Sequence, residues 1–182
     1  SVADADGKTL ALTYDAASGL ITQIADSSGD LLKIAYYIGT RNIKEISTET
    51  KPNADGTGTT KITKRVGYTY DTSNRLASVS VDLTPDNTSD ASTYATAYSY
   101  GTNNKLASIA QSDGSILAID YQADGRVKTL TDWRGSLDAS IVTSFIYGTS
   151  DTTVTTTGGG ATATAKQTYK LLYESAAGQN NQ

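Results

Sequence analysis

The chain has 182 residues, a mass of 19.1 kDa and a formal net charge of −4, from 15 basic and 19 acidic side chains. It contains no Cys, His or Met. These absences exclude a Ser-His-Asp triad, a cysteine nucleophile, a thiolate zinc site and an imidazole proton switch. The mild negative charge gives no bias toward nucleic acid, and no apolar stretch approaches the roughly 18 residues that a membrane span requires.

A strand pattern recurs along the chain and ends each time at a tyrosine. Before these tyrosines, apolar residues alternate with other residues at the period of two that places one set of side chains on one face of a sheet. The clearest examples are Leu10, Leu12 and Tyr14; Val66, Tyr68 and Tyr70; Leu117, Ile119 and Tyr121; and Phe145 with Tyr147. The sequence therefore predicts a β-strand that leads into each tyrosine.

Turn-forming residues and a second apolar segment follow each tyrosine. The turns are rich in Asp, Asn, Ser and Gly, which tolerate positive φ and bond their own backbone. Aliphatic residues then stand six and nine positions after the tyrosine, as Leu76 and Val79 do after Tyr70. In a regular strand a spacing of three sends them to opposite faces, so we expect either partial cover on both faces or a bulge that restores the register. Each unit is predicted to be a β-hairpin.

The hairpin units repeat when they are aligned on their tyrosines. The segments 70–79, 100–109 and 121–130 share the tyrosine, an Asn or Gly four positions later, and a base followed by an aliphatic residue. These base–aliphatic pairs are Arg75 with Leu76, Lys105 with Leu106, and Arg126 with Val127. The anchor tyrosines define six to seven units at spacings of 21 to 33 residues, and they are Tyr14, Tyr37, Tyr70, Tyr100, Tyr121, Tyr147 and Tyr173.

Hairpins of this kind are expected to pair edge to edge in one extended, curved antiparallel sheet over residues 1–182, as a fragment of a larger protein. A β-sandwich is the alternative fold. Equivalent tyrosines of adjacent hairpins should lie roughly 9.6 Å apart, too far for direct ring contact, so aliphatic residues should fill the gap. The recurring bases are expected either to stack over a tyrosine or to pair with a turn aspartate.

The units resemble the YD repeat of bacterial Rhs proteins, Tc-toxin components and teneurins, whose signature is close to Tyr-Asp-x-x-Gly-Arg-Leu. Tyr14-Asp15 and Tyr70-Asp71 keep the first two residues, and Gly125-Arg126-Val127 is similar to the last three. The resemblance implies a sheet that spirals into a hollow shell, in several members around a toxic polypeptide. Its self-cleaving segment has no counterpart here, so the resemblance implies a scaffold and not a protease.

The resemblance and the open edges also indicate partners. We expect the sheet to continue into further repeats of the parent protein, or to associate with itself through its edges. A polypeptide cargo is the other expected partner. The lack of Cys and Met, together with the resemblance, indicates a secreted or cell-surface protein of bacteria.

Two other function classes stay open. Trp133 is the one aromatic residue outside the repeat pattern, and it is either a sugar-stacking residue of an adhesin or carbohydrate-binding domain, or a plug in the core. A hydrolase would need two of the 19 acidic residues to converge, and no motif indicates such a pair. We therefore expect no enzymatic activity and no cofactor.

Two further clusters favour a structural interpretation. The acidic turns at 4–7 and 53–56 lack the spaced ligands and the later bidentate Glu of an EF-hand, so no metal site is expected. Lys61, Lys64 and Arg65 alternate with apolar residues, which is typical of the solvated side of a strand. No nucleic acid partner is expected from them.

Overall fold

The computed structural model describes residues 2–3, 5, 7–50, 58–87, 89–134, 140–158 and 167–172. These residues form strands, turns and bends, with no helix among them and therefore no helical membrane span. The first eight strands are β1 (Val2–Ala3), β2 (Thr9–Tyr14), β3 (Ile21–Asp26), β4 (Leu31–Tyr36), β5 (Ile43–Thr50), β6 (Lys61–Tyr70), β7 (Leu76–Asp82) and β8 (Thr93–Tyr100). The remaining strands are β9 (Leu106–Gln111), β10 (Ser115–Tyr121), β11 (Val127–Arg134), β12 (Ile141–Tyr147), β13 (Asp151–Gly158) and β14 (Gln167–Leu172).

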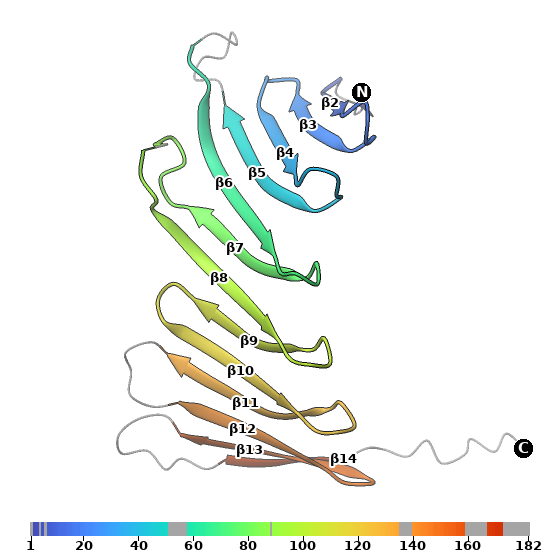
Figure 1. Cartoon of the computed structure of the whole chain (residues 1–182), viewed down its shortest axis with the longest axis vertical. Coiled ribbons are helices and arrows are strands. Elements are labelled where there is room, and N and C mark those ends of the chain that lie inside the picture. Colours follow the sequence, from blue (N-terminus) through green and yellow to red (C-terminus); the bar gives the residue numbers. More distant parts are fainter. Residues whose placement is uncertain are drawn as a thin grey trace, which may run out of the picture. The chain divides into compact units, whose positions relative to one another are not determined.

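The strands follow one another in an open antiparallel sheet in the order in which they occur in the chain. This order confirms the predicted tandem hairpins. Among the described residues each strand pairs only with strands adjacent in sequence, so the β-sandwich alternative, which needs non-local pairing, is wrong. The chain divides into two compact units, Ser1–Thr96 and Ala97–Gln182, with β8 contributing to both. Within each unit the turns after the anchor tyrosines lie at one end of the strands (Figure 1).

A β-bulge explains why the aliphatic residues stand three apart. In the β6–β7 hairpin Tyr70 pairs with Leu76 and Tyr68 pairs with Val79, because the register shifts by one residue between Thr69 and Tyr70. The extra residue brings Leu76 and Val79 to the same face of the sheet. The β10–β11 hairpin and the β2–β3 hairpin have the same shift at their tyrosines. Of the two alternatives, the bulge is therefore confirmed.

The second anchor differs from the prediction by one residue. The structure pairs Tyr36, and not Tyr37, with Ile43 across the bulge. Tyr37 instead occupies the first turn position, where Asp15 and Asp71 stand in neighbouring hairpins, and its N–H closes the turn on the carbonyl of Asn42. The prediction failed because a turn longer by one residue lets either tyrosine satisfy the spacing to the aliphatic residues.

Left-handed backbone recurs at one position of the turns. Asn74 and Asn104 have φ values of 64° and 58°, and Gly125 has a φ of 88°. These are the Asn or Gly residues four positions after the tyrosine, and they are the residue types that adopt positive φ at least cost. Sequence and backbone therefore agree on why this position of the repeat is restricted to Asn and Gly.

No described apolar residue is fully buried. The buried residues of the described part are polar, namely Ser47 and Thr152. This follows from the architecture, because within each unit no second described layer covers the sheet. The apolar side chains gain cover from their neighbours in the same sheet, and the anchors Tyr36, Tyr121 and Tyr147 are all half-buried.

Several predicted features lie outside the described residues. They are Tyr173, the acidic turn at 53–56, and Asp4 and Asp6 of the turn at 4–7. The last two strands, β13 and β14, pair from Asp151 with Leu172 to Thr156 with Gln167.

Candidate functional site: the tyrosine face

The alternation of side chains gives each unit one face that carries the tyrosines and aliphatic residues, which we call the tyrosine face. In the first unit its strand residues include Leu12, Tyr14, Ile24, Ile34, Tyr36, Ile46, Val66, Tyr68, Tyr70, Val79 and Val81. In the second unit they include Ile109, Leu117, Ile119, Tyr121, Leu130, Phe145, Tyr147 and Val154. The tyrosines and aliphatic residues of the repeat motifs therefore lie on this face.

The anchor tyrosines connect consecutive hairpins through their hydroxyl groups. Tyr36 donates to the carbonyl of Ile21 at 2.9 Å, and Tyr121 donates to the carbonyl of Leu106 at 2.9 Å. Tyr147 makes the same bond to the carbonyl of Val127, also at 2.9 Å. Each acceptor is the first aliphatic residue after the turn of the preceding hairpin. One side chain thus covers its neighbour with a ring and satisfies a backbone carbonyl next to the bulge.

Two of the recurring bases, Lys105 and Arg126, lie over the tyrosine of the following hairpin. The Nζ atom of Lys105 is 4.8 Å from the centre of the Tyr121 ring, and the guanidinium carbon of Arg126 is 4.2 Å from the centre of the Tyr147 ring. Both distances suit cation–π attraction. Lys105 also donates to the carbonyl of Gly125. The predicted stacking is confirmed for these two bases.

The predicted pairing of bases with turn aspartates is confirmed as well. The two Asp71 carboxylate oxygens accept hydrogen bonds from the backbone N–H groups of Ser73 and Arg75 and from the Arg75 side chain, whose Nε lies 2.7 Å away. Asp124 holds the Arg126 backbone and guanidinium in the same way. In the first hairpin Asp15 instead accepts from the N–H and hydroxyl of Ser18. An aspartate therefore closes each of these turns, directly after the tyrosine at Asp15 and Asp71 and three positions after it at Asp124.

These contacts lower the pKa of the turn aspartates. For Asp71 the causes are first the backbone N–H of Arg75 and then its side chain, and for Asp124 the Arg126 side chain comes first. The Ser18 hydroxyl is the main cause of the lowered pKa of Asp15. Donated hydrogen bonds favour the charged form of a carboxylate. The ionised aspartates are thus part of the folded turn.

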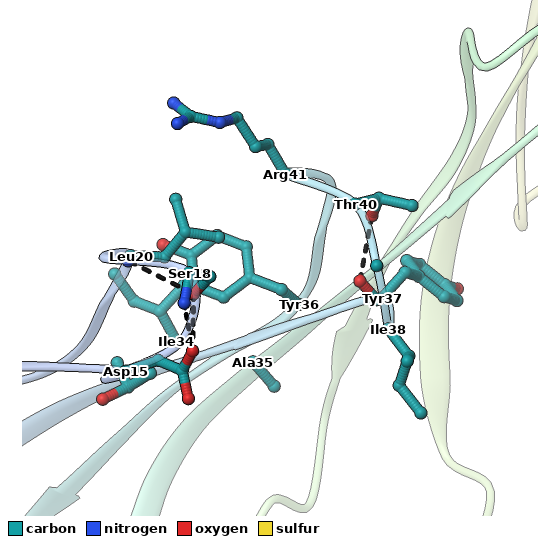
Figure 2. Close-up of a pocket in the computed structure, with 12 residues that line it drawn as sticks. Asp15, Ser18, Leu20, Ile34, Ala35, Tyr36, Tyr37, Ile38, Thr40 and Arg41 are labelled. Carbon is teal, nitrogen blue, oxygen red and sulfur yellow. Dashed lines mark hydrogen bonds between the residues drawn. The ribbon is translucent and has the colours of Figure 1, made fainter.

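One ring contact contradicts the expected separation of the tyrosines. Tyr37 and Tyr70 lie edge to face with ring centres 6.0 Å apart. Tyr37 makes this contact from the turn, and not from a strand, and its hydroxyl donates to the carbonyl of Tyr68 at 3.0 Å. Figure 2 shows Tyr36 and Tyr37 pointing in opposite directions beside a cavity of about 620 Å³. The β4–β5 hairpin therefore contacts the next hairpin through Tyr37 and the preceding hairpin through Tyr36.

The opposite face carries polar pairs that the sequence analysis missed. Beside the bulges, the Thr69 and Ser78 hydroxyls lie 2.7 Å apart, and the Ser99 and Ser108 hydroxyls lie 2.6 Å apart. Thr129 donates to Asp120 at the corresponding position of a third hairpin. In each pair the residues stand one before and eight after the tyrosine, a spacing that sequence inspection alone could have detected. These pairs fix the register from the side away from the tyrosines.

Ion pairs engage three basic residues of the first unit, and those of Arg65 and Lys33 lie on this opposite face. Arg65 contacts Asp82 at 3.1 Å and Glu45 at 3.8 Å, and Lys33 contacts Glu49 at 2.6 Å. Lys61 pairs with Asp86. The basic cluster of β6 is therefore paired with acidic groups to a large extent, and among the described residues no group of His, Cys, Asp or Glu side chains is arranged to hold a metal ion.

Trp133 lies on the face opposite the tyrosines. It pairs across β10–β11 with Ile116, and the two side chains are 42 % and 38 % exposed. The interpretation of Trp133 as a plug in the core is therefore wrong. The other interpretation, a solvent-accessible aromatic ring, matches its position.

Comparisons with known proteins find similarity to this chain at the level of structure. No family model and no curated protein matches it. Among solved structures, the chain is similar to a chain in the crystal structure of TcdB2-TccC3-Cdc42, with a TM-score of 0.35 and 11 % sequence identity. The similar region covers 89 % of this chain and 13 % of that one.

The first prediction concerns the hydroxyl bonds between hairpins. Tyr121→Phe keeps the ring beneath Lys105 but removes the bond to Leu106, so we expect the free energy of unfolding to fall by about 1 kcal/mol. Tyr14→Phe is the matched control, because no described residue accepts a bond from Tyr14. Urea denaturation of both variants measures the difference, and equal stability would show that the hydroxyl bond contributes nothing.

A second prediction follows from the turn aspartates. Their pKa values are lowered in the folded chain from an ordinary value of 3.8, so the unfolded chain binds more protons near that pH. The aspartates' contribution to the free energy of unfolding should be fully present above a pH of about 3.8, and it should be lost as the pH falls through the lower pKa of the folded state. Thermal unfolding at a series of pH values tests this expectation. Asp71→Asn should be less stable at neutral pH and should lose less stability in acid than the wild-type chain.

Proposed function

We propose that this chain is a segment of a non-catalytic β-scaffold of the YD-repeat type, which encloses or presents a polypeptide. The observation that carries the proposal is that polar and apolar side chains have different roles within the repeat. The anchor hydroxyls and recurring bases hold neighbouring hairpins together and the turn aspartates close the turns, whereas the apolar side chains form a face that no second described layer covers. An exposed apolar face of this kind is suited to bind the apolar side chains of an unfolded or partly folded polypeptide.

The acidic groups support a role without catalysis. Carboxylate-pair hydrolysis uses one acid whose pKa is raised, so that it is protonated when it acts. The turn aspartates Asp15, Asp71 and Asp124 are shifted in the other direction, by hydrogen bonds that hold them ionised. Their geometry serves the turns, and we propose no reaction for them.

The open edges support the proposed partners. A sheet whose strands follow chain order can be lengthened by further repeats at either edge without rearrangement of the existing strands. We accordingly propose that the chain joins further repeats of its parent protein, and that it acts in secretion or at the surface of a bacterial cell.

The test uses unfolded polypeptide and two matched variants of β7. We expect reduced, carboxymethylated α-lactalbumin to bind the chain saturably. Val81 lies on the tyrosine face and is 42 % exposed, whereas Ser80 points to the opposite face. Val81→Glu should weaken binding by several-fold and Ser80→Glu should leave it unchanged, as measured by fluorescence anisotropy. Equal effects of the two variants, or no binding, would contradict the proposal.

Carbohydrate binding is the second candidate function, and the exposure of Trp133 beside Ile116 favours it. An accessible indole ring can stack on the apolar face of a sugar. A glycan array is the direct measurement. Binding that disappears in Trp133→Ala and persists in Ile116→Ala would establish an adhesin-type function, and an array without signal would remove it.

A further inference from the structure

One interface inside the first unit lacks the hydroxyl bond found at β3–β4, β9–β10 and β11–β12. At those three interfaces the donor tyrosine stands three residues after the last paired residue of its strand, and the acceptor stands two residues before the first paired residue of the neighbouring strand. At β5–β6 the corresponding pair is Gly67 with Glu45, so Tyr70 holds the donor's place and Ile43 the acceptor's. Within the described part of the chain no hydrogen bond joins the Tyr70 hydroxyl to the Ile43 carbonyl.

Tyr37 connects these two hairpins instead of Tyr70. Its hydroxyl donates to the carbonyl of Tyr68 at 3.0 Å, and its ring meets the Tyr70 ring at 6.0 Å between centres and 87° between planes. The Tyr70 hydroxyl is left without a hydrogen-bond partner among the described residues.

The recurring base is also absent from this interface. The residue directly before the first aliphatic residue of the second strand is Lys105 in one hairpin and Arg126 in another, and both lie over a tyrosine ring. In the β4–β5 hairpin this residue is Asn42, whose side chain bonds that of Asn74 in the next hairpin. A short amide therefore stands where other hairpins carry a long basic side chain, which leaves space beside the Tyr70 ring.

A cavity of about 560 Å³ lies at this interface. Its volume is in the range of roughly 300–1,000 Å³ that small-molecule sites occupy. Tyr36, Tyr37 and Tyr70 line it, and its charged lining residue is Lys44. Lys44 is exposed, it forms no ion pair with a described residue, and no described acidic side chain lines the cavity. The cavity thus combines aromatic walls with one positive charge and one uncommitted phenol.

We propose that this cavity is a binding site for a small planar aromatic carboxylate. The ring of the ligand packs against the rings of Tyr37 and Tyr70, which favour offset or edge-to-face contact with another aromatic group. Its carboxylate accepts a charge-assisted hydrogen bond from the Lys44 ammonium group and a second bond from the Tyr70 hydroxyl.

The lining argues against a cationic ligand. A cation in this cavity would be repelled by Lys44 and would meet no described carboxylate. The Tyr70 ring is also already in contact with Tyr37, whereas Tyr121 and Tyr147 have a base over their rings.

Two probes with the same ring and opposite charge test the ligand class. We expect 2-naphthoate to bind the chain saturably in isothermal titration calorimetry, and 2-naphthylmethylammonium to bind at least tenfold more weakly. The absence of saturable naphthoate binding, or ammonium binding of equal or greater strength, would overturn the proposal.

A matched pair of lysine variants locates the site. Lys44→Gln should weaken naphthoate binding about tenfold through loss of a charge-assisted hydrogen bond. Lys128→Gln is the control, because Lys128 is exposed and follows Val127 in β11 as Lys44 follows Ile43 in β5. It should leave binding unchanged. Equal binding by the wild-type and Lys44→Gln chains, or an equal loss in both variants, would contradict the proposed site.

Tyr70→Phe separates binding from stability. It should weaken naphthoate binding about fivefold through loss of one hydrogen bond, and it should leave the free energy of unfolding in urea unchanged because the hydroxyl has no partner within the described chain. Unchanged binding, or a stability loss like that expected of Tyr121→Phe, would count against the assignment.

This inference goes beyond the scaffold function and is tested separately from it. Val81→Glu, which is expected to weaken the binding of unfolded polypeptide to the tyrosine face, should leave naphthoate binding unchanged, since Val81 does not line the cavity. A parallel loss of naphthoate binding in Val81→Glu would place the probe on the tyrosine face and overturn the cavity site.

Discussion

The bond from an anchor hydroxyl to the carbonyl of the preceding hairpin is the interaction on which the rest of the structure depends. An isolated hairpin is at best marginally stable in water, and within each unit of this chain no second described layer buries its apolar face. Stability must therefore come from the contact of each hairpin with its neighbours. Tyr36, Tyr121 and Tyr147 supply that contact at the point where the bulge interrupts the regular ladder.

The prevalence of tyrosine over phenylalanine follows from this architecture. The chain has twelve tyrosines and one phenylalanine. A half-exposed position disfavours a purely apolar ring, whereas tyrosine covers its neighbours with the ring and directs the hydroxyl to a polar group. Phe145 illustrates the exception, because it stacks beside Tyr147 with ring centres 6.4 Å apart and leaves the link to β11 to Tyr147.

The sequence predicted the features that depend on local pattern. Alternation identified the strands, turn composition identified the positive φ at Asn74, and the spacing of Leu76 and Val79 reduced the register to two alternatives, of which the bulge is correct. Pattern did not resolve Tyr36 from Tyr37, because adjacent tyrosines before a longer turn fit nearly the same spacing. It missed the hydroxyl pairs of the opposite face because Ser and Thr carry no distinctive chemistry until a partner is placed beside them. The identity of the proposed partners depends on which molecules bind the tyrosine face and the sheet edges, and no sequence pattern within the chain specifies those molecules.

The repeat has a direction, and this makes its two edges chemically different. The β10–β11 hairpin offers Tyr121 to the hairpin before it and Arg126 with the Val127 carbonyl to the hairpin after it. A leading edge therefore presents a phenol and a trailing edge presents a cation and an acceptor. Two leading edges would bring tyrosine against tyrosine, with two donors and no cation. We therefore expect any assembly through such edges to be head to tail, the geometry that extends a sheet in one direction and does not close it into a two-fold pair.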